Sequence, residues 1–153
     1  MNEGCPRYNS KRSAALSAYQ AVGVRAGVDE ANPHRLIQML MNGVLDRVAQ
    51  ARGHMERGEI APKGEQVSRA ITILEGLRIC LDPEPSAELA ERLEQLYDYM
   101  QRRLTEANLY NDTGRLDEVL RLMKAIKSGW DGIPAAAVEQ AIAQRAEPRE
   151  TSP

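Results

Sequence analysis

Apolar side chains recur every three or four residues along four long segments of this chain, and that spacing gathers them on one face of an α-helix. The first segment begins at Asn32-Pro33, because Asn can accept hydrogen bonds from the free amides of a first turn and Pro suits the first helical position. It ends near Gly58. Its apolar face consists of Leu36, Ile37, Leu40, Val44, Val48, Ala51 and Met55, with Met41 and Leu45 on one flank.

Three further helices are predicted, over about 65–81, about 87–110 and the residues that follow the turn at 111–114. The second helix has an apolar face of Val67, Ala70, Ile71, Leu74, Leu77 and Leu81, extended by Ile73 and Cys80. The third has Leu89, Leu93, Leu96, Met100, Leu104 and Ala107, flanked by Tyr97, Tyr99 and Tyr110. The fourth has Leu116, Val119, Leu120, Met123, Ile126 and Trp130. Ile79 points away from its face and is a candidate exposed apolar residue.

Four such helices joined by short connections predict an all-α fold, an antiparallel four-helix bundle, because short connections force neighbouring helices to run in opposite directions. Leu16, Tyr19 and Val22 add a short extra N-terminal helix. The expected organisation is a mobile N-terminus over 1–13, the bundle domain over 14–133, and a weakly helical to disordered tail over 134–153.

Composition and charge exclude some classes of partner for such a bundle. Charged residues make up 27% of the chain and the net charge is -2, so the clustered Lys and Arg of a nucleic-acid binder are missing. The first residues lack the apolar stretch of a signal peptide, and no apolar run approaches the roughly 20 residues that cross a bilayer. We therefore expect a cytoplasmic protein without membrane insertion.

The sequence offers little for catalysis. A di-metal site in a bundle needs a Glu-x-x-His pattern on two helices, and neither His34 nor His54 follows a Glu at that spacing. His34 is most simply a solvent-facing residue of a first turn, and His54 lies near a helix end. Cys5 and Cys80 have no metal or redox spacing, and no glycine-rich phosphate loop is present. The chain is expected to be no enzyme and to need no metal or cofactor.

An ordered series of short blocks resembles the flagellar export chaperone FliS family over about 19–133. The most specific blocks are Asn32-Pro33-His34-Arg35-Leu36-Ile37, Leu96-Tyr97-Asp98-Tyr99-Met100, Ala107-Asn108 and the single Trp130. The resemblance implies a four-helix bundle that works without ATP. It also implies binding of the C-terminal segment of flagellin, which is disordered when free and becomes helical around the chaperone. Such binding prevents premature polymerisation and keeps flagellin competent for export.

We predict an apolar surface groove as the binding site. The residues assigned to it are Leu40, Met41, Val44, Leu45, Ile71, Ile73, Leu74, Tyr97 and Met100, with Leu16 and Tyr19 as a movable cover. Core and groove positions share one helical spacing, so Met39 and Met41 fit either gap-filling or an adaptable surface. The N-terminal segment fits either a cover or a permanent cap. The alternative function is a self-associating helical adaptor that binds another export or regulatory factor.

Overall fold

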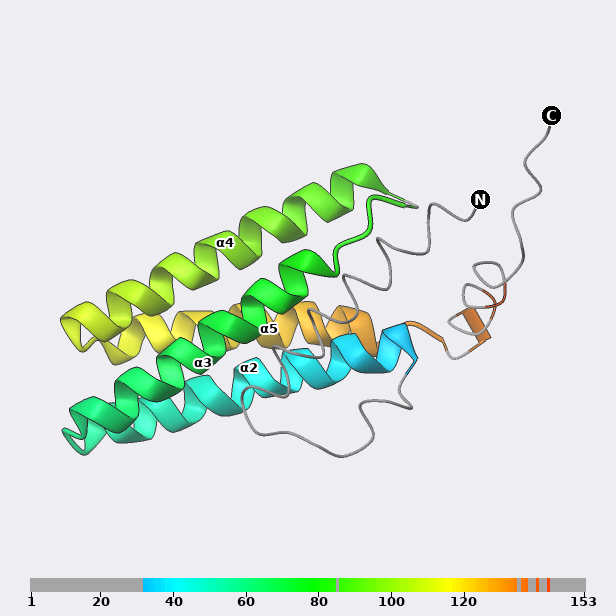
Figure 1. Cartoon of the computed structure of the whole chain (residues 1–153). Helices are drawn as coiled ribbons and strands as arrows, with labels where there is room; N and C mark the ends of the chain where they lie inside the picture. The colour runs from blue at the N-terminus through cyan, green and yellow to red at the C-terminus, as the bar shows by residue number, and fades with distance from the viewer. Residues whose placement is uncertain (1–31, 85, 135, 138–139, 141–142, 144–153) are drawn as a thin grey trace, which may run out of the picture.

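The structure is a computed structural model of the chain that describes residues 32–84, 86–134, 136–137, 140 and 143. Over these residues it contains four long α-helices and no strand (Figure 1). The helices are α2 (Pro33–Glu56), α3 (Ile60–Ile79), α4 (Ala87–Tyr110) and α5 (Thr113–Asp131). The predicted all-α helical bundle is confirmed. The predicted N-terminal helix, with Leu16, Tyr19 and Val22, lies outside the described residues.

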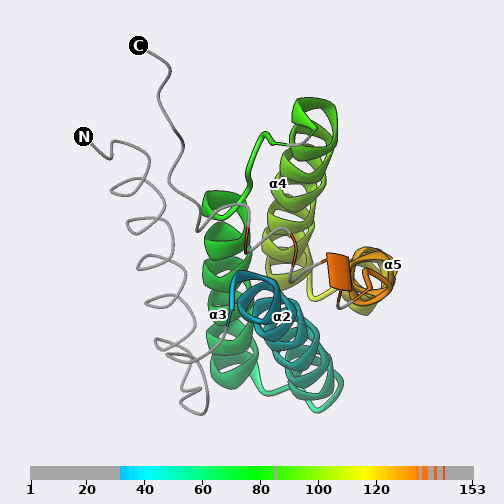
Figure 2. The ribbon, with the colours of Figure 1, turned by 90° about the vertical axis from the view of Figure 1, so that its right-hand side faces the viewer.

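The four helices form a ring in which each packs against its two neighbours in the order α2, α3, α4, α5 and back to α2 (Figure 2). Consecutive helices run antiparallel, as their short connections require (Figure 1). Packing is most extensive between α2 and α3 and least extensive between α4 and α5. The α4–α5 side is therefore the least closed side of the ring.

Capping residues set the helix ends where the sequence predicted them. The Asn32 side chain accepts a hydrogen bond from the backbone N–H of Arg35 at 2.8 Å. Ser86 Oγ accepts one from the N–H of Leu89 at 3.2 Å, which starts α4. At its other end α4 stops at Asn111, whose φ of 52° lies in the left-handed region that Asn tolerates better than most residues.

Helix α3 begins earlier than predicted, at Ile60 and not near residue 65. Pro62 sits in its first turn, where a missing N–H costs no helical hydrogen bond. Ile60, Ala61 and Pro62 are all exposed, so this turn buries no apolar face. A prediction based on buried periodicity detects the helix only from Val67 onward.

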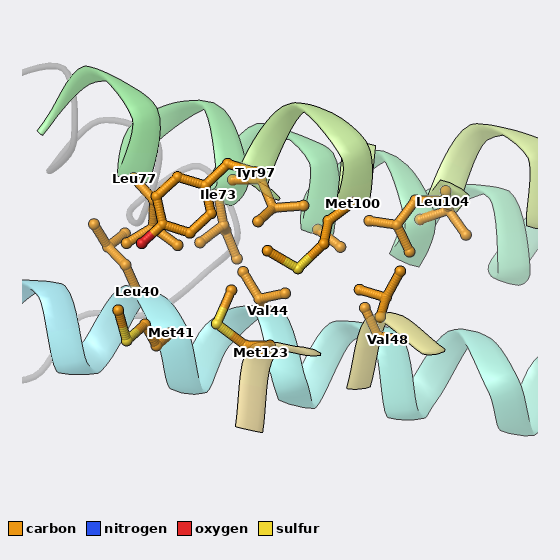
Figure 3. Close-up of a cluster of buried hydrophobic side chains, with 14 of the residues drawn as sticks. Leu40, Met41, Val44, Val48, Ile73, Leu77, Tyr97, Met100, Leu104 and Met123 are labelled. Carbon is orange, nitrogen blue, oxygen red and sulfur yellow. The ribbon is translucent and has the colours of Figure 1, made fainter. Parts of the chain in front are cut away.

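The core fills the centre of the ring with interdigitating aliphatic and methionine side chains from all four helices (Figure 3). Its largest fully buried members are Tyr97, Leu40, Met41, Ile73, Leu74, Leu77, Met100, Leu104, Leu116 and Met123. The chain has no Phe, and the flexible methionines occupy gaps between the branched side chains. Met39 and Met41 are both buried, so in this structure they belong to the core.

Candidate functional site

Most residues assigned to the groove lie inside the bundle. Leu40, Met41, Val44, Ile73, Leu74, Tyr97 and Met100 are at most 2% exposed and belong to one core cluster. Leu45 and Ile71 are half-buried on the outer flanks of that cluster. Of this set, Leu45 and Ile71 are therefore the described residues that are partly exposed to solvent. Leu16 and Tyr19 lie outside the described residues, and the role of all these residues in binding stays a prediction.

Leu45 lies in an open pocket between α2 and α5. The pocket has a volume of about 380 Å³ and is lined by Asn42, Leu45, Lys124, Lys127, Ser128 and Asp131. Lys127 is paired with Asp131 in the same helix turn, and the Gln38 side-chain amide donates to the Asp131 carboxylate at 2.8 Å. The lining of this pocket thus combines one apolar side chain with amide, hydroxyl and charged groups.

Several large apolar side chains are exposed that periodicity placed in the core or did not single out. Leu89 was predicted on the apolar face of its helix but is 58% exposed, and that prediction was wrong. At the other end of α4, Leu109 is 71% exposed and Tyr110 is 64% exposed. Ile79, predicted to be exposed, is half-buried. Spacing alone could not identify Leu89 as exposed, because Leu89 has the same helical repeat as the buried residues that follow it.

One end of the bundle is closed by an aromatic contact between the start of α2 and the end of α5. The rings of His34 and Trp130 stack with centroids 4.8 Å apart, and Trp130 Nε1 donates to the His34 backbone oxygen at 3.1 Å. Burial lowers the pKa of His34, while the charge of Asp131 partly opposes this effect. His34, expected to face solvent, is half-buried, because the Trp130 ring stacks on its own.

A polar network joins the second half of α4 to the first half of α5. Glu118 accepts hydrogen bonds from the Tyr99 hydroxyl at 2.7 Å and from Arg103 Nε at 2.8 Å. The hydrogen bond from Tyr99 has the largest effect on the pKa of Glu118 and lowers it, and the bond from Arg103 lowers it further. Arg115 adds a further link by donating to Glu106 at 3.1 Å. This network sets the distance between the two helices over their shared half.

Lys63 is a buried charged residue that the sequence pattern did not single out. Its side chain is 5% exposed, and Nζ donates to the backbone oxygen of Asn108 and to Asn111 Oδ1, both at 3.1 Å. The ammonium group therefore satisfies a carbonyl at the C-terminal end of α4, where a positive charge is favourable. No local motif signals this contact, because its partners lie 45 and 48 residues away.

Over the part of the chain that the structure describes, no group of three or more His, Cys, Asp or Glu side chains could hold a metal ion. None of the four helices combines the length and apolar character that crossing a membrane requires.

The sequence matches known proteins over the whole bundle. The model of the family described as "Flagellar protein FliS" matches residues 15–137. The flagellar secretion chaperone FliSB of Pseudomonas aeruginosa is 56% identical over 119 residues, covering 78% of this chain and 94% of that protein. The flagellar secretion chaperone FliS of Vibrio cholerae is 42% identical, covering 78% and 88%. That of Salmonella typhimurium is 41% identical, covering 84% and 96%. All four helices lie within the matched region.

Proposed function

We propose, because the chain belongs to the FliS family of flagellar proteins, that it is a cytoplasmic secretion chaperone for flagellin and not an enzyme. It binds the C-terminal segment of flagellin, prevents premature polymerisation and keeps the subunit competent for export. The observation that carries this proposal is the family match, which spans the entire bundle and includes relatives named as flagellar secretion chaperones.

The physics of the bundle supports such a partner. A segment that is disordered when free loses conformational entropy on binding, so the complex must bury a large apolar area to offset that loss. All four helices carry partly buried apolar side chains packed against the edge of the core. They include Ile37, Leu45, Ile71, Leu81, Leu93, Leu120, Leu122 and Ile126. A helix lying across such flanks is a common mode of peptide recognition.

We assign the predicted binding surface to two flanks of the bundle, that of Leu45 on α2 beside α5 and that of Ile71 on α3 beside α4. The buried members of the predicted set, such as Val44 and Met100, support the shape of this surface from inside. Leu16 and Tyr19 act as the cover that leaves the groove when flagellin arrives. This assignment rests on the family resemblance and on the half-buried state of the two flank residues.

Isothermal titration calorimetry tests the proposal. The full-length protein is titrated with a peptide of the last ~40 residues of the flagellin from the same organism, and far-UV circular dichroism is recorded in parallel. We expect one-to-one binding, a negative heat-capacity change and a gain of helix beyond the sum of the two components. A scrambled peptide of the same composition is the control. Absence of binding, together with a stable dimer on size exclusion, would refute the proposal and favour the self-associating adaptor.

A further inference from the structure

The start of α2 and the end of α5 meet at one end of the bundle (Figure 1). The chain enters the four helices at Pro33 and leaves them at Asp131, so both remaining parts of the chain continue from this end. A contact that fastens α2 to α5 here therefore acts where the chain enters and leaves the bundle.

Three contacts fasten the two helices at this end. The His34 and Trp130 rings stack with an interplanar angle of 12°, and Trp130 Nε1 donates to the His34 backbone oxygen at 3.1 Å. One turn further along α2, the Gln38 amide donates to the Asp131 carboxylate at 2.8 Å. We call these four residues the latch: His34, Gln38, Trp130 and Asp131. Its hydrogen bonds join residues 93 and 96 positions apart, so the latch exists only while the first turn of α2 and the last turn of α5 are in contact.

His34 is the residue of the latch whose charge changes near neutral pH, because histidine ordinarily titrates there. Its ring is half-buried against Trp130, and the first turn of a helix disfavours a positive charge. Burial therefore lowers the pKa of His34 from 6.5, although the charge of Asp131 partly raises it. The Asp131 carboxylate stays ionised over the same range, since above all the hydrogen bond from Lys127 lowers its pKa.

Charged side chains from α2 and from both helices packed against it lie near this end: Arg35 on α2, Lys127 and Asp131 on α5, Arg78 in the last turn of α3, and Asp82 just after it. Among the charges of described residues, that of Asp131 is the one that shifts the pKa of His34. Lys127 is paired with Asp131, and Arg78 is paired with glutamates of α3 and α4. The proton affinity of His34 is therefore set within the latch itself.

We propose that the latch is a proton-sensitive fastening between α2 and α5, closed while the His34 ring is neutral and opened when the ring takes up a proton. The closed latch binds this proton less readily than a solvated imidazole does, so linkage requires the proton to favour the open state by the same factor. The inference does not rest on the proposed function. Asp131 and Lys127 also line the pocket beside Leu45, so opening of the latch changes the shape and charge of that pocket.

Hydrogen exchange of the Trp130 indole N–H measures opening directly, because this group donates to His34 in the closed latch and the chain has one Trp. The exchange rate in the full-length protein is divided by that of N-acetyltryptophanamide at each pH, which removes the intrinsic pH dependence. We expect protection in wild type to fall at least ~2-fold between pH 7.5 and 5.5, and protection in His34→Gln not to change with pH. The control His54→Gln should follow wild type, because His54 lies at the other end of α2. A pH response that is absent in wild type, or equally large in His34→Gln, would overturn the inference.

Titration of the histidine Cε1 protons by NMR provides a second readout, which does not require His34→Gln to fold. The chain has two histidines, so His54→Gln assigns the signal of His34. We expect the pKa of His34 in wild type to lie below 6.5 and Asp131→Asn to lower it further, because this substitution removes the charge that raises it. A pKa of His34 at or above 6.5, or one that Asp131→Asn raises or leaves unchanged, would show that the latch does not respond to protons as proposed.

Discussion

Replacing Lys63 with Met tests whether the buried ammonium group holds the end of α4 in place. Met has nearly the length of the lysine stem, so Lys63→Met keeps most of the packing and removes the two hydrogen bonds to Asn108 and Asn111. Bonds from a charged donor contribute ~1.5–3 kcal/mol each, and the desolvation of a buried ammonium offsets part of that sum. We expect a net loss of ~2 kcal/mol in the free energy of unfolding.

Urea denaturation followed by circular dichroism measures this change. With a slope of ~2 kcal/mol per molar urea, the unfolding midpoint should fall by about 1 M at an unchanged slope. Lys124→Met is the matched control, because Lys124 is exposed and forms no ion pair with a described residue, and we expect its midpoint to stay within ~0.2 M of wild type. A Lys63→Met midpoint equal to that of Lys124→Met would show that the two hydrogen bonds contribute no net stability.

Two tyrosines and one histidine give further predictions. The Tyr97 hydroxyl is buried, which raises its pKa, and it forms no hydrogen bond with a described residue. Tyr97→Phe should therefore keep or raise the unfolding midpoint. Tyr99→Phe loses the hydrogen bond to Glu118 and should lower the midpoint. The reverse order of the two midpoints would contradict this. Because burial lowers the pKa of His34 from 6.5, the unfolded chain takes up this proton more readily, and stability should decrease as pH falls below 6.5. Midpoints at pH 7.5 and 5.5 should differ less in His34→Gln than in wild type, and an equal difference would show that His34 is not the titrating group.

The helices themselves were predictable from local chemistry. Asn32 and Ser86 start α2 and α4 because their side chains accept amide hydrogen bonds, which depends on neighbours within three residues. The first turn of α3 escaped prediction for the opposite reason, since Ile60 faces solvent and contributes nothing to the buried pattern. Helix ends that depend on contacts within one or two turns could be predicted from the sequence, whereas the exposed first turn of α3 could not.

The candidate site was less predictable because it depends on where neighbouring helices lie. Val44 and Leu45 are adjacent in the sequence and were assigned to one groove, yet Val44 is inside the core and Leu45 is on its flank. Leu89 has the same periodicity as Leu104, but Leu89 is exposed at the start of α4, where α4 and α5 lie farther apart (Figures 1 and 2). Such differences arise from the relative placement of whole helices, which a periodic pattern does not contain.

Because the interior is rich in methionine, the oxidation of this protein depends on how often its helices separate. Met41, Met100 and Met123 are at most 1% exposed, so an oxidant reaches their sulfur atoms only when the helices separate. The sulfoxide that forms is polar and does not fit back into the same space. The rate at which these three residues are oxidised therefore reports how often the bundle opens. A partner that inserts between the helices would accelerate that reaction, whereas a partner that lies across their outer surface would slow it.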